Sequence, residues 1–188
     1  GRKERGICAM IDGYGRTIDY VRISVTDRCN LRCVYCMPEE GVCSISHEEI
    51  LRFGEIERVC QILAENGIQK IKLTGGEPLV RRRLPELAAA LKQIPGIKSL
   101  TITTNGVLLE EMYDALADAG VDSVTISLDT LDASVYRQLT RRDEIEAVRR
   151  GLRTAIQKGR MQIKINCVPV LGIEEQKLLE VAELAKNH

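Results

Sequence analysis

Strand-like and helix-like segments alternate five times along this chain of 188 residues, and the alternation constrains the fold more than any other feature. Each short apolar run is followed by a segment with apolar residues at the spacing of an amphipathic helix. Such alternation predicts βα units and a parallel sheet. The expected strands are Tyr20–Thr26, Lys70–Thr74, Ser99–Thr103, Ser123–Asp129 and Gln162–Val168. The expected helices are Ser46–Asn66, Leu84–Ile94, Leu108–Ala119, Asp143–Lys158 and Ile173–Lys186.

Capping signals mark the ends of these helices. Ser46 followed three residues later by Glu49 has the pattern of a capping box, so the first helix is expected to begin there. Glycines are expected to stop the helices, with Gly67 after the first and Gly159 after the fourth.

All five expected strands are apolar at alternate positions only. A strand buried on both faces of a doubly wound sheet would be apolar almost throughout. If helices cover the apolar face, the other face of the sheet is polar. A polar face is expected inside a fold only where it encloses water and a ligand. We therefore expect an α/β fold whose sheet curves around a polar cavity, a partial (β/α) barrel. A one-sided sheet with a solvated polar face is the alternative.

Three cysteines, Cys29, Cys33 and Cys36, lie within eight residues directly after the first strand. Cysteine thiolates hold iron–sulfur clusters, and a cubane bound by three of them keeps one iron open to a small molecule. A structural zinc site needs four ligands, and neither Cys43 nor His47 supplies a second paired spacing. The loop therefore predicts a cluster with one open iron, with a zinc or redox CxxC loop as the alternative.

Further motifs follow the second, third and fourth strands. In barrels of this type the active site is built from loops at the carboxyl ends of the strands. Segment 75–78 (GGEP) follows strand two, where two glycines let the backbone approach a ligand closely and the proline stiffens the exit. Segments 103–106 (TTNG) and 127–129 (SLD) end strands three and four; ordinary turn chemistry is the alternative for both.

The spacing CxxxCxxC, with the aromatic Tyr35 before its third cysteine, resembles the signature of the radical S-adenosylmethionine (SAM) superfamily, and 75–77 resembles its GGE motif. Segments 22–38, 73–82, 103–107 and 127–129 are similar to one family within it, molybdenum cofactor biosynthesis protein A, the GTP 3′,8-cyclases. The likeness runs from about Asp12 to the last residue. It implies a lyase that uses a 5′-deoxyadenosyl radical from SAM to convert GTP to 3′,8-cyclo-7,8-dihydro-GTP.

The resemblance also implies a role for individual positions. A 4Fe–4S cluster would be ligated by Cys29, Cys33 and Cys36. SAM would be contacted by Tyr35, Gly76, Glu77 and Ser127. GTP would be contacted by Arg22, Lys72, Thr103 and Lys164. The family usually has arginine at position 72; lysine keeps the charge but loses the bidentate fork. No residue is assigned a catalytic role.

Three basic residues on the expected strands indicate an anionic substrate independently of the family resemblance. Arg22, Lys72 and Lys164 lie on the polar face of three different expected strands. Three cations aimed into one cavity suit a polyphosphate. The run Arg81–Arg83 stays unassigned, because a charge run usually lies on a solvated face.

Only part of the family's pattern is present. The resemblance implies six βα units and a C-terminal region whose three further cysteines bind a second 4Fe–4S cluster. Five units are found here, and after Cys60 only Cys167 remains. We expect an N-terminal extension (1–19), a truncated core (20–188), and a fragment that is incomplete for full turnover because the sixth unit and the C-terminal region are missing.

Composition limits the partners. The 27 basic and 27 acidic residues cancel, so net charge does not indicate nucleic-acid binding. No apolar stretch has the length of a membrane span and the first residues lack a signal-peptide core, so a cytoplasmic protein with no membrane partner is expected. The resemblance implies GTP, an electron donor and a downstream pterin-forming enzyme as partners, and it admits a homodimer.

Two alternative functions remain open. Another radical SAM enzyme, such as a peptide-modifying one with an auxiliary cluster domain, would share the cysteine and GGE motifs. The cations Arg22 and Lys164 argue against it, because its substrate carries no triphosphate. A non-enzymatic metal-binding module would explain the cysteines alone and leave the motifs at the strand ends without a purpose.

Overall fold

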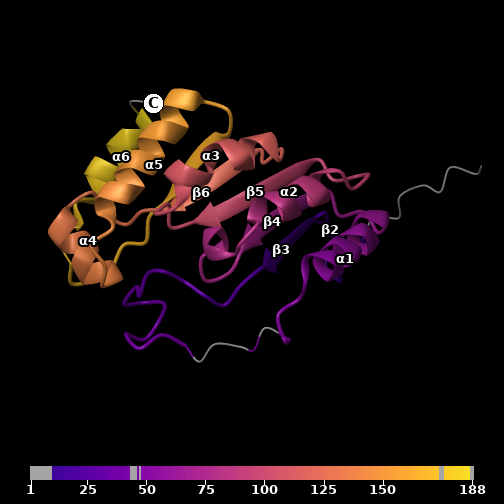
Figure 1. The fold of residues 1–188 in the computed structure, drawn as a ribbon, viewed down its shortest axis with the longest axis horizontal. Helices are drawn as coiled ribbons and strands as arrows, with labels where there is room; N and C mark the ends of the chain where they lie inside the picture. The colour runs from indigo at the N-terminus through magenta and orange to yellow at the C-terminus, as the bar shows by residue number, and fades with distance from the viewer. Residues whose placement is uncertain (1–9, 43–45, 47, 174–175, 187–188) are drawn as a thin grey trace, which may run out of the picture.

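Five parallel strands form one sheet in which every strand pairs with the next along the chain (Figure 1). The computed structural model describes residues 10–42, 46, 48–173 and 176–186. The strands are β3 (Tyr20–Ser24), β4 (Lys70–Thr74), β5 (Ser99–Thr104), β6 (Ser123–Ser127) and β7 (Gln162–Asn166). A doubly wound sheet reverses its strand order at a switch point, and this sheet does not. The order is that of consecutive units of a (β/α) barrel, so the predicted fold class is confirmed.

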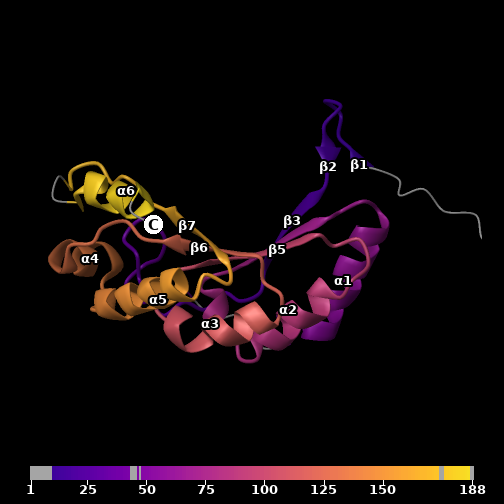
Figure 2. The same ribbon diagram turned by 90° about the horizontal axis from the view of Figure 1, so that it is seen from above.

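The major helices lie together on one side of the sheet (Figure 2). They are α1 (Phe53–Glu65), α2 (Leu84–Lys92), α3 (Leu109–Asp118) and α5 (Ile145–Lys158). A short antiparallel hairpin, β1 (Met10–Ile11) with β2 (Thr17–Ile18), projects from the other side. The 3-10 turn η1 (Pro78–Val80), helix α4 (Ala133–Thr140) and helix α6 (Leu178–Lys186) complete the described elements.

The core lies between the helices and the apolar face of the sheet. The inward-facing side chains of the three central strands are at most 1% exposed: Ile71, Leu73, Leu100, Ile102, Val124 and Ile126. Burying one such side chain stabilises a fold by about 1.5–3 kcal/mol. The strict alternation in the sequence therefore supplies one dry face for the helices and leaves the other face polar.

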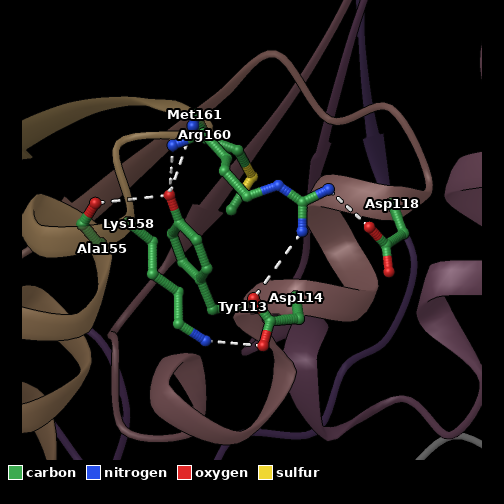
Figure 3. A network of polar contacts seen from close by, with 7 residues as sticks. All are labelled: Tyr113, Asp114, Asp118, Ala155, Lys158, Arg160 and Met161. Carbon is green, nitrogen blue, oxygen red and sulfur yellow. Dashed lines mark hydrogen bonds and ion pairs between the residues drawn. The ribbon is translucent and has the colours of Figure 1, made fainter.

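A buried tyrosine joins α3, α5 and the start of β7 (Figure 3). The Tyr113 hydroxyl donates to the Ala155 carbonyl (3.3 Å) and accepts from the Arg160 and Met161 amides (3.0 and 3.3 Å). Around it, Lys158 pairs with Asp114 at 2.6 Å on the helical side of the sheet. This network is structural and lies away from the cysteine loop.

The first helix begins later than predicted. The Glu49 carboxylate does accept from the Ser46 amide (3.3 Å) and hydroxyl (2.9 Å), but these bonds close an isolated turn. Helix α1 begins seven residues later, where the Glu55 carboxylate accepts from the Arg52 amide at 2.7 Å. The predicted stops Gly67 and Gly159 have positive φ, 99° and 58°, as expected for helix ends.

Other boundaries differ by smaller amounts, and some elements were not predicted. Strands β3, β6 and β7 end two residues before the predicted ends, although the Val25 and Leu128 amides still donate to the last residues of the neighbouring strands, Thr74 and Asn166. The last helix begins at Leu178 rather than Ile173, and residues 174–175 lie outside the described part of the chain. Helix α4 and the β1–β2 hairpin had no counterpart in the prediction. Cys8, Cys43 and His47 also lie outside the described residues.

Among the helices that the structure describes, none combines the length and the apolar character needed to cross a membrane.

Candidate functional site at the carboxyl ends of the strands

The register of the sheet arranges the predicted site residues in rows on its polar face. Arg22 is the Cα partner of Lys72 on the adjoining strand. One step nearer the carboxyl ends, Thr125 pairs with Thr103 on one side and Lys164 on the other. The final row holds Ser127. Residues predicted to contact substrate thus lie deeper along the strands than the residue predicted to contact SAM.

The register places two of the three predicted cations side by side and the third farther along the sheet. Arg22 and Lys72 are neighbours on β3 and β4, whereas Lys164 lies on β7. Three strand spacings separate Lys72 from Lys164, roughly 14 Å along the sheet. Arg22 and Lys164 are exposed, and within the described residues no hydrogen bond or ion pair engages any of the three side chains. Their placement along the sheet suits the two ends of an extended anion.

The cysteine loop, residues 28–37, carries three thiols that are not in disulfides. Cys29 and Cys33 are half-buried, and Cys36 is exposed. Burial raises the pKa of the Cys29 thiol. Burial, followed by the nearby charges of Cys29 and Asp129, raises the pKa of Cys33 to about 11. Without metal the Cys29 and Cys33 thiols therefore hold their protons near neutral pH, and a bound metal would displace those protons.

The glycine loop, residues 75–77, packs directly on the segment that leads into the cysteine loop. The Gly76 amide donates to the Thr26 carbonyl (2.8 Å), and the Glu77 amide donates to the Arg28 carbonyl (2.7 Å). A Cβ atom added at Gly76 would lie 2.3 Å from the Arg28 carbonyl oxygen. The predicted close approach of backbone therefore exists, but among the described residues the partner of these glycines is the segment 26–28, which leads into the cysteine loop.

Glu77 has a buried carboxylate, 1% exposed, that joins the ends of β4 and β5. It accepts from the Leu79 amide (2.9 Å), the Thr104 hydroxyl (2.7 Å) and the Asn105 amide (2.6 Å). Burial raises the pKa of Glu77 while these three bonds oppose the rise. Both carboxylate oxygens of Glu77 accept hydrogen bonds from the protein. This side chain can therefore affect a ligand indirectly, by fixing the positions of the loops after β4 and β5.

Tyr35 links the cysteine loop to the end of β6. Its hydroxyl donates to a carboxylate oxygen of Asp129 at 2.5 Å, and burial followed by this bond raises the pKa of Tyr35. The other Asp129 oxygen accepts from the Val168 amide at 2.8 Å, just after β7. The loops after β3, β6 and β7 are therefore joined through one carboxylate.

The donor set and its surroundings fit a cubane cluster. Within the described part of the chain, no three His, Cys, Asp or Glu side chains are close enough to hold a single metal ion. A cubane does not need that, because each thiolate binds a different iron. Among the described residues the buried Tyr136 hydroxyl has no hydrogen-bond partner, and its pKa is raised first by burial and then by the proximity of Cys33. An unpartnered hydroxyl beside half-buried thiols is the kind of group that an absent ligand satisfies.

Two residues at this site, Asn105 and Arg81, were not assigned a role from the sequence. The Asn105 side chain donates to Asn30 (2.7 Å) and lies 3.9 Å from the Cys29 sulfur, which joins the loop after β5 to the cysteine loop. Arg81 belongs to the charge run 81–83, which the sequence left unassigned. Its guanidinium donates to the carbonyls of Val25 and Leu51 and stacks on the Phe53 ring. Asn105 lay within a motif at a strand end, but nothing in the sequence indicated its partner.

Comparisons with known proteins show the family to which this chain is similar. The family model described as the radical SAM superfamily matches residues 23–185. A GTP 3′,8-cyclase of Pelotomaculum thermopropionicum is 50% identical over 178 residues, which cover 95% of this chain and 55% of the relative. A GTP 3′,8-cyclase of Petrotoga mobilis is 47% identical over 169 residues, covering 90% and 52%. This chain therefore spans about half the length of the curated relatives it matches.

Solved structures show the same fold at low identity. Methylornithine synthase (PylB) superposes with a TM-score of 0.70 at 19% identity, over 89% of this chain and 50% of that one. At this identity the likeness concerns the fold alone.

Proposed function

The chain belongs to the radical SAM superfamily, and from this premise we propose that it is the radical-generating part of a GTP 3′,8-cyclase of molybdenum cofactor biosynthesis. The observation that carries the proposal is the 50% identity to a protein of that name over 95% of this chain. When bound, the 4Fe–4S cluster supplies the electron that splits SAM into methionine and the 5′-deoxyadenosyl radical, which takes hydrogen from C3′ of GTP.

The protein's own task is to bind, orient and shield. Cys29, Cys33 and Cys36 would hold the cluster, because they are the thiols of one loop at the carboxyl end of β3. Tyr35 and the glycine loop would lie against SAM, and Ser127 in the last row of the polar face would reach the same ligand. Glu77 would not touch SAM directly. It would hold the glycine loop in position by its hydrogen bond to the Asn105 amide at the end of β5.

GTP would lie along the polar face in an extended form. Arg22 and Lys72 would share one end of the anion, and Lys164 would bind roughly 14 Å away across the sheet. Thr103 would donate or accept a hydrogen bond between them. This spacing favours a long, polyanionic nucleotide over a small anion, because only an extended ligand can contact all three cations.

The proposed setting is the cytoplasm, with an electron donor that reduces the cluster and a downstream pterin-forming enzyme that takes the product. None of the five described cysteines is in a disulfide, as expected in a reducing compartment. The second cluster would belong to the part of the relatives that this chain does not cover.

The function is tested with the full-length protein under anaerobic conditions. Incubation with SAM, a reductant and GTP deuterated at C3′ is expected to move deuterium into 5′-deoxyadenosine and to yield a cyclised isomer of GTP. Mass spectrometry measures both products. SAM cleavage that is indifferent to GTP and transfers no deuterium would contradict the proposal and favour another radical SAM substrate, such as a peptide.

Lys164→Ala in the full-length protein is expected to weaken GTP binding roughly ten- to a hundred-fold. A hydrogen bond to a charged group contributes about 1.5–3 kcal/mol, and each 1.4 kcal/mol or so is a factor of ten. Arg22→Ala should act similarly. Lys72→Ala should act less, because lysine already lacks the bidentate fork. Calorimetry with GTP measures the affinities.

Lys158→Ala is the matched control. Lys158 lies on the helical side of the sheet, where it pairs with Asp114 (Figure 3). Its loss is expected to leave GTP affinity unchanged and to cost less than about 1 kcal/mol of stability. Unchanged GTP affinity in Lys164→Ala would show that the nucleotide does not lie across the polar face.

A further inference from the structure

Arg141 has a backbone conformation that is unusual for its residue type. It follows the last residue of α4 with a φ of 55° in the left-handed region. A side chain with a Cβ atom is disfavoured there, and glycine is the usual residue at such a helix end. A non-glycine residue that holds this conformation calls for contacts that offset the strain.

Those contacts go to the cysteine loop. One guanidinium nitrogen, Nη1, of Arg141 donates to the Arg32 carbonyl at 3.1 Å and to the Met37 carbonyl at 3.2 Å. These two carbonyls flank the segment that holds Cys33 and Cys36. More than a hundred residues of sequence separate the donor from its acceptors. The Arg141 guanidinium therefore joins the two ends of the segment 32–37 from a residue that lies outside the loop.

Helix α4 receives hydrogen bonds from the same loop in return. The last carbonyls of a helix have no partner within it. Here the Val34 amide donates to the Leu139 carbonyl at 2.9 Å, and the Arg32 amide donates to the Thr140 carbonyl at 3.0 Å. The cysteine loop thus caps the helix, and the residue after the helix holds the cysteine loop. Arg32 takes part through both its amide and its carbonyl.

We propose that Arg141 is a positioning residue that clamps the cysteine loop to the end of α4, so that the three thiols are held ready for the cluster. The clamp acts through backbone carbonyls and leaves the sulfur atoms free for iron. It deepens the proposed function, on which its role in radical generation rests. The clamp itself is a property of the metal-free chain and can be measured without any reaction.

The test uses the full-length protein with three substitutions, Arg141→Gly, Arg141→Ala and Arg141→Lys. Hydrogen exchange of the metal-free protein, followed by mass spectrometry, reports on peptides from residues 28–37. Loss of a charged hydrogen bond changes an opening equilibrium by roughly ten- to a hundred-fold. Exchange of the Arg32 and Val34 amides is expected to speed up by at least about ten-fold in the glycine and alanine variants, with an intermediate effect for lysine.

The glycine variant separates positioning from general stability. It removes the guanidinium and also the backbone strain, so it should unfold at no lower temperature than the alanine variant while its cysteine loop exchanges as fast. In the reconstituted glycine variant, the change that SAM causes in the electron paramagnetic resonance spectrum of the reduced cluster should be broadened or lost. The matched control is Arg137→Ala, which removes an exposed arginine of the same helix that pairs with Asp143.

Parent-like exchange of residues 28–37 in Arg141→Gly would overturn the proposal, as would equally fast exchange in Arg137→Ala. If exchange behaves as expected but the parent protein does not convert GTP, the clamp stands and the proposed function fails.

Discussion

Cys33→Ala in the full-length protein is expected to reduce SAM cleavage to background and to remove the oxygen-sensitive 4Fe–4S centre with the open iron. Cys33 is the middle thiol of the cysteine loop, and clusters of this kind depend on every thiolate ligand. Iron and sulfide analysis after anaerobic reconstitution measures the centre. Release of 5′-deoxyadenosine measures SAM cleavage. A centre that forms unchanged in the variant, or stoichiometric zinc in the parent without iron, would refute the ligand set.

Cys60→Ala is the control for this result. Cys60 lies on α1 and is 1% exposed, packed in the hydrophobic core. Its replacement removes a thiol of the same chain without touching the cysteine loop. Iron content and SAM cleavage should match those of the parent. The two variants together distinguish loss of a ligand from general loss of a cysteine.

Gly76→Ala is expected to damage both the fold and the activity. The added Cβ atom would lie 2.3 Å from the Arg28 carbonyl oxygen and 2.8 Å from that of Asp27, and both contacts are to backbone. Forcing extra volume into such a contact costs about 1–3 kcal/mol. The cysteine loop must shift to relieve the clash, and a misplacement of about 1 Å can cost a hundred-fold in rate. Denaturant unfolding and SAM cleavage measure the two effects.

Gly54→Ala gives the opposite expectation for the same chemical change. Gly54 lies in α1, and a Cβ atom there would meet nothing within 4 Å. Alanine favours a helix over glycine by about 1 kcal/mol, so this variant should be slightly more stable and fully active. Equal stability of Gly76→Ala and the parent would mean that the glycine loop is not packed on the cysteine loop as described.

Predictions from the sequence were most accurate where apolar residues recur at a regular spacing. Alternate apolar positions, such as Ile71 and Leu73 on β4, predicted both the strand and the face that the helices cover, and both side chains are fully buried. The same reading failed at the start of α1. Ser46 and Glu49 have the pattern of a capping box and do bond to each other, yet the helix begins at Phe53. A short capping motif specifies a turn, whereas continuation into a helix depends on the residues that follow.

By itself, the sequence determined the fold class, the alternation of strands and helices, and the cysteine loop after the first strand, because these depend on periodicity and spacing along the chain. Tertiary structure alone decided the rest. It separated Lys164 from Lys72 by three strands, set Gly76 against the Arg28 carbonyl, and brought Arg141 to the cysteine loop. The physical reason is that side-chain patterns report on which face a residue occupies. Contacts between loops instead depend on how distant backbone segments approach each other, and no local pattern records that approach.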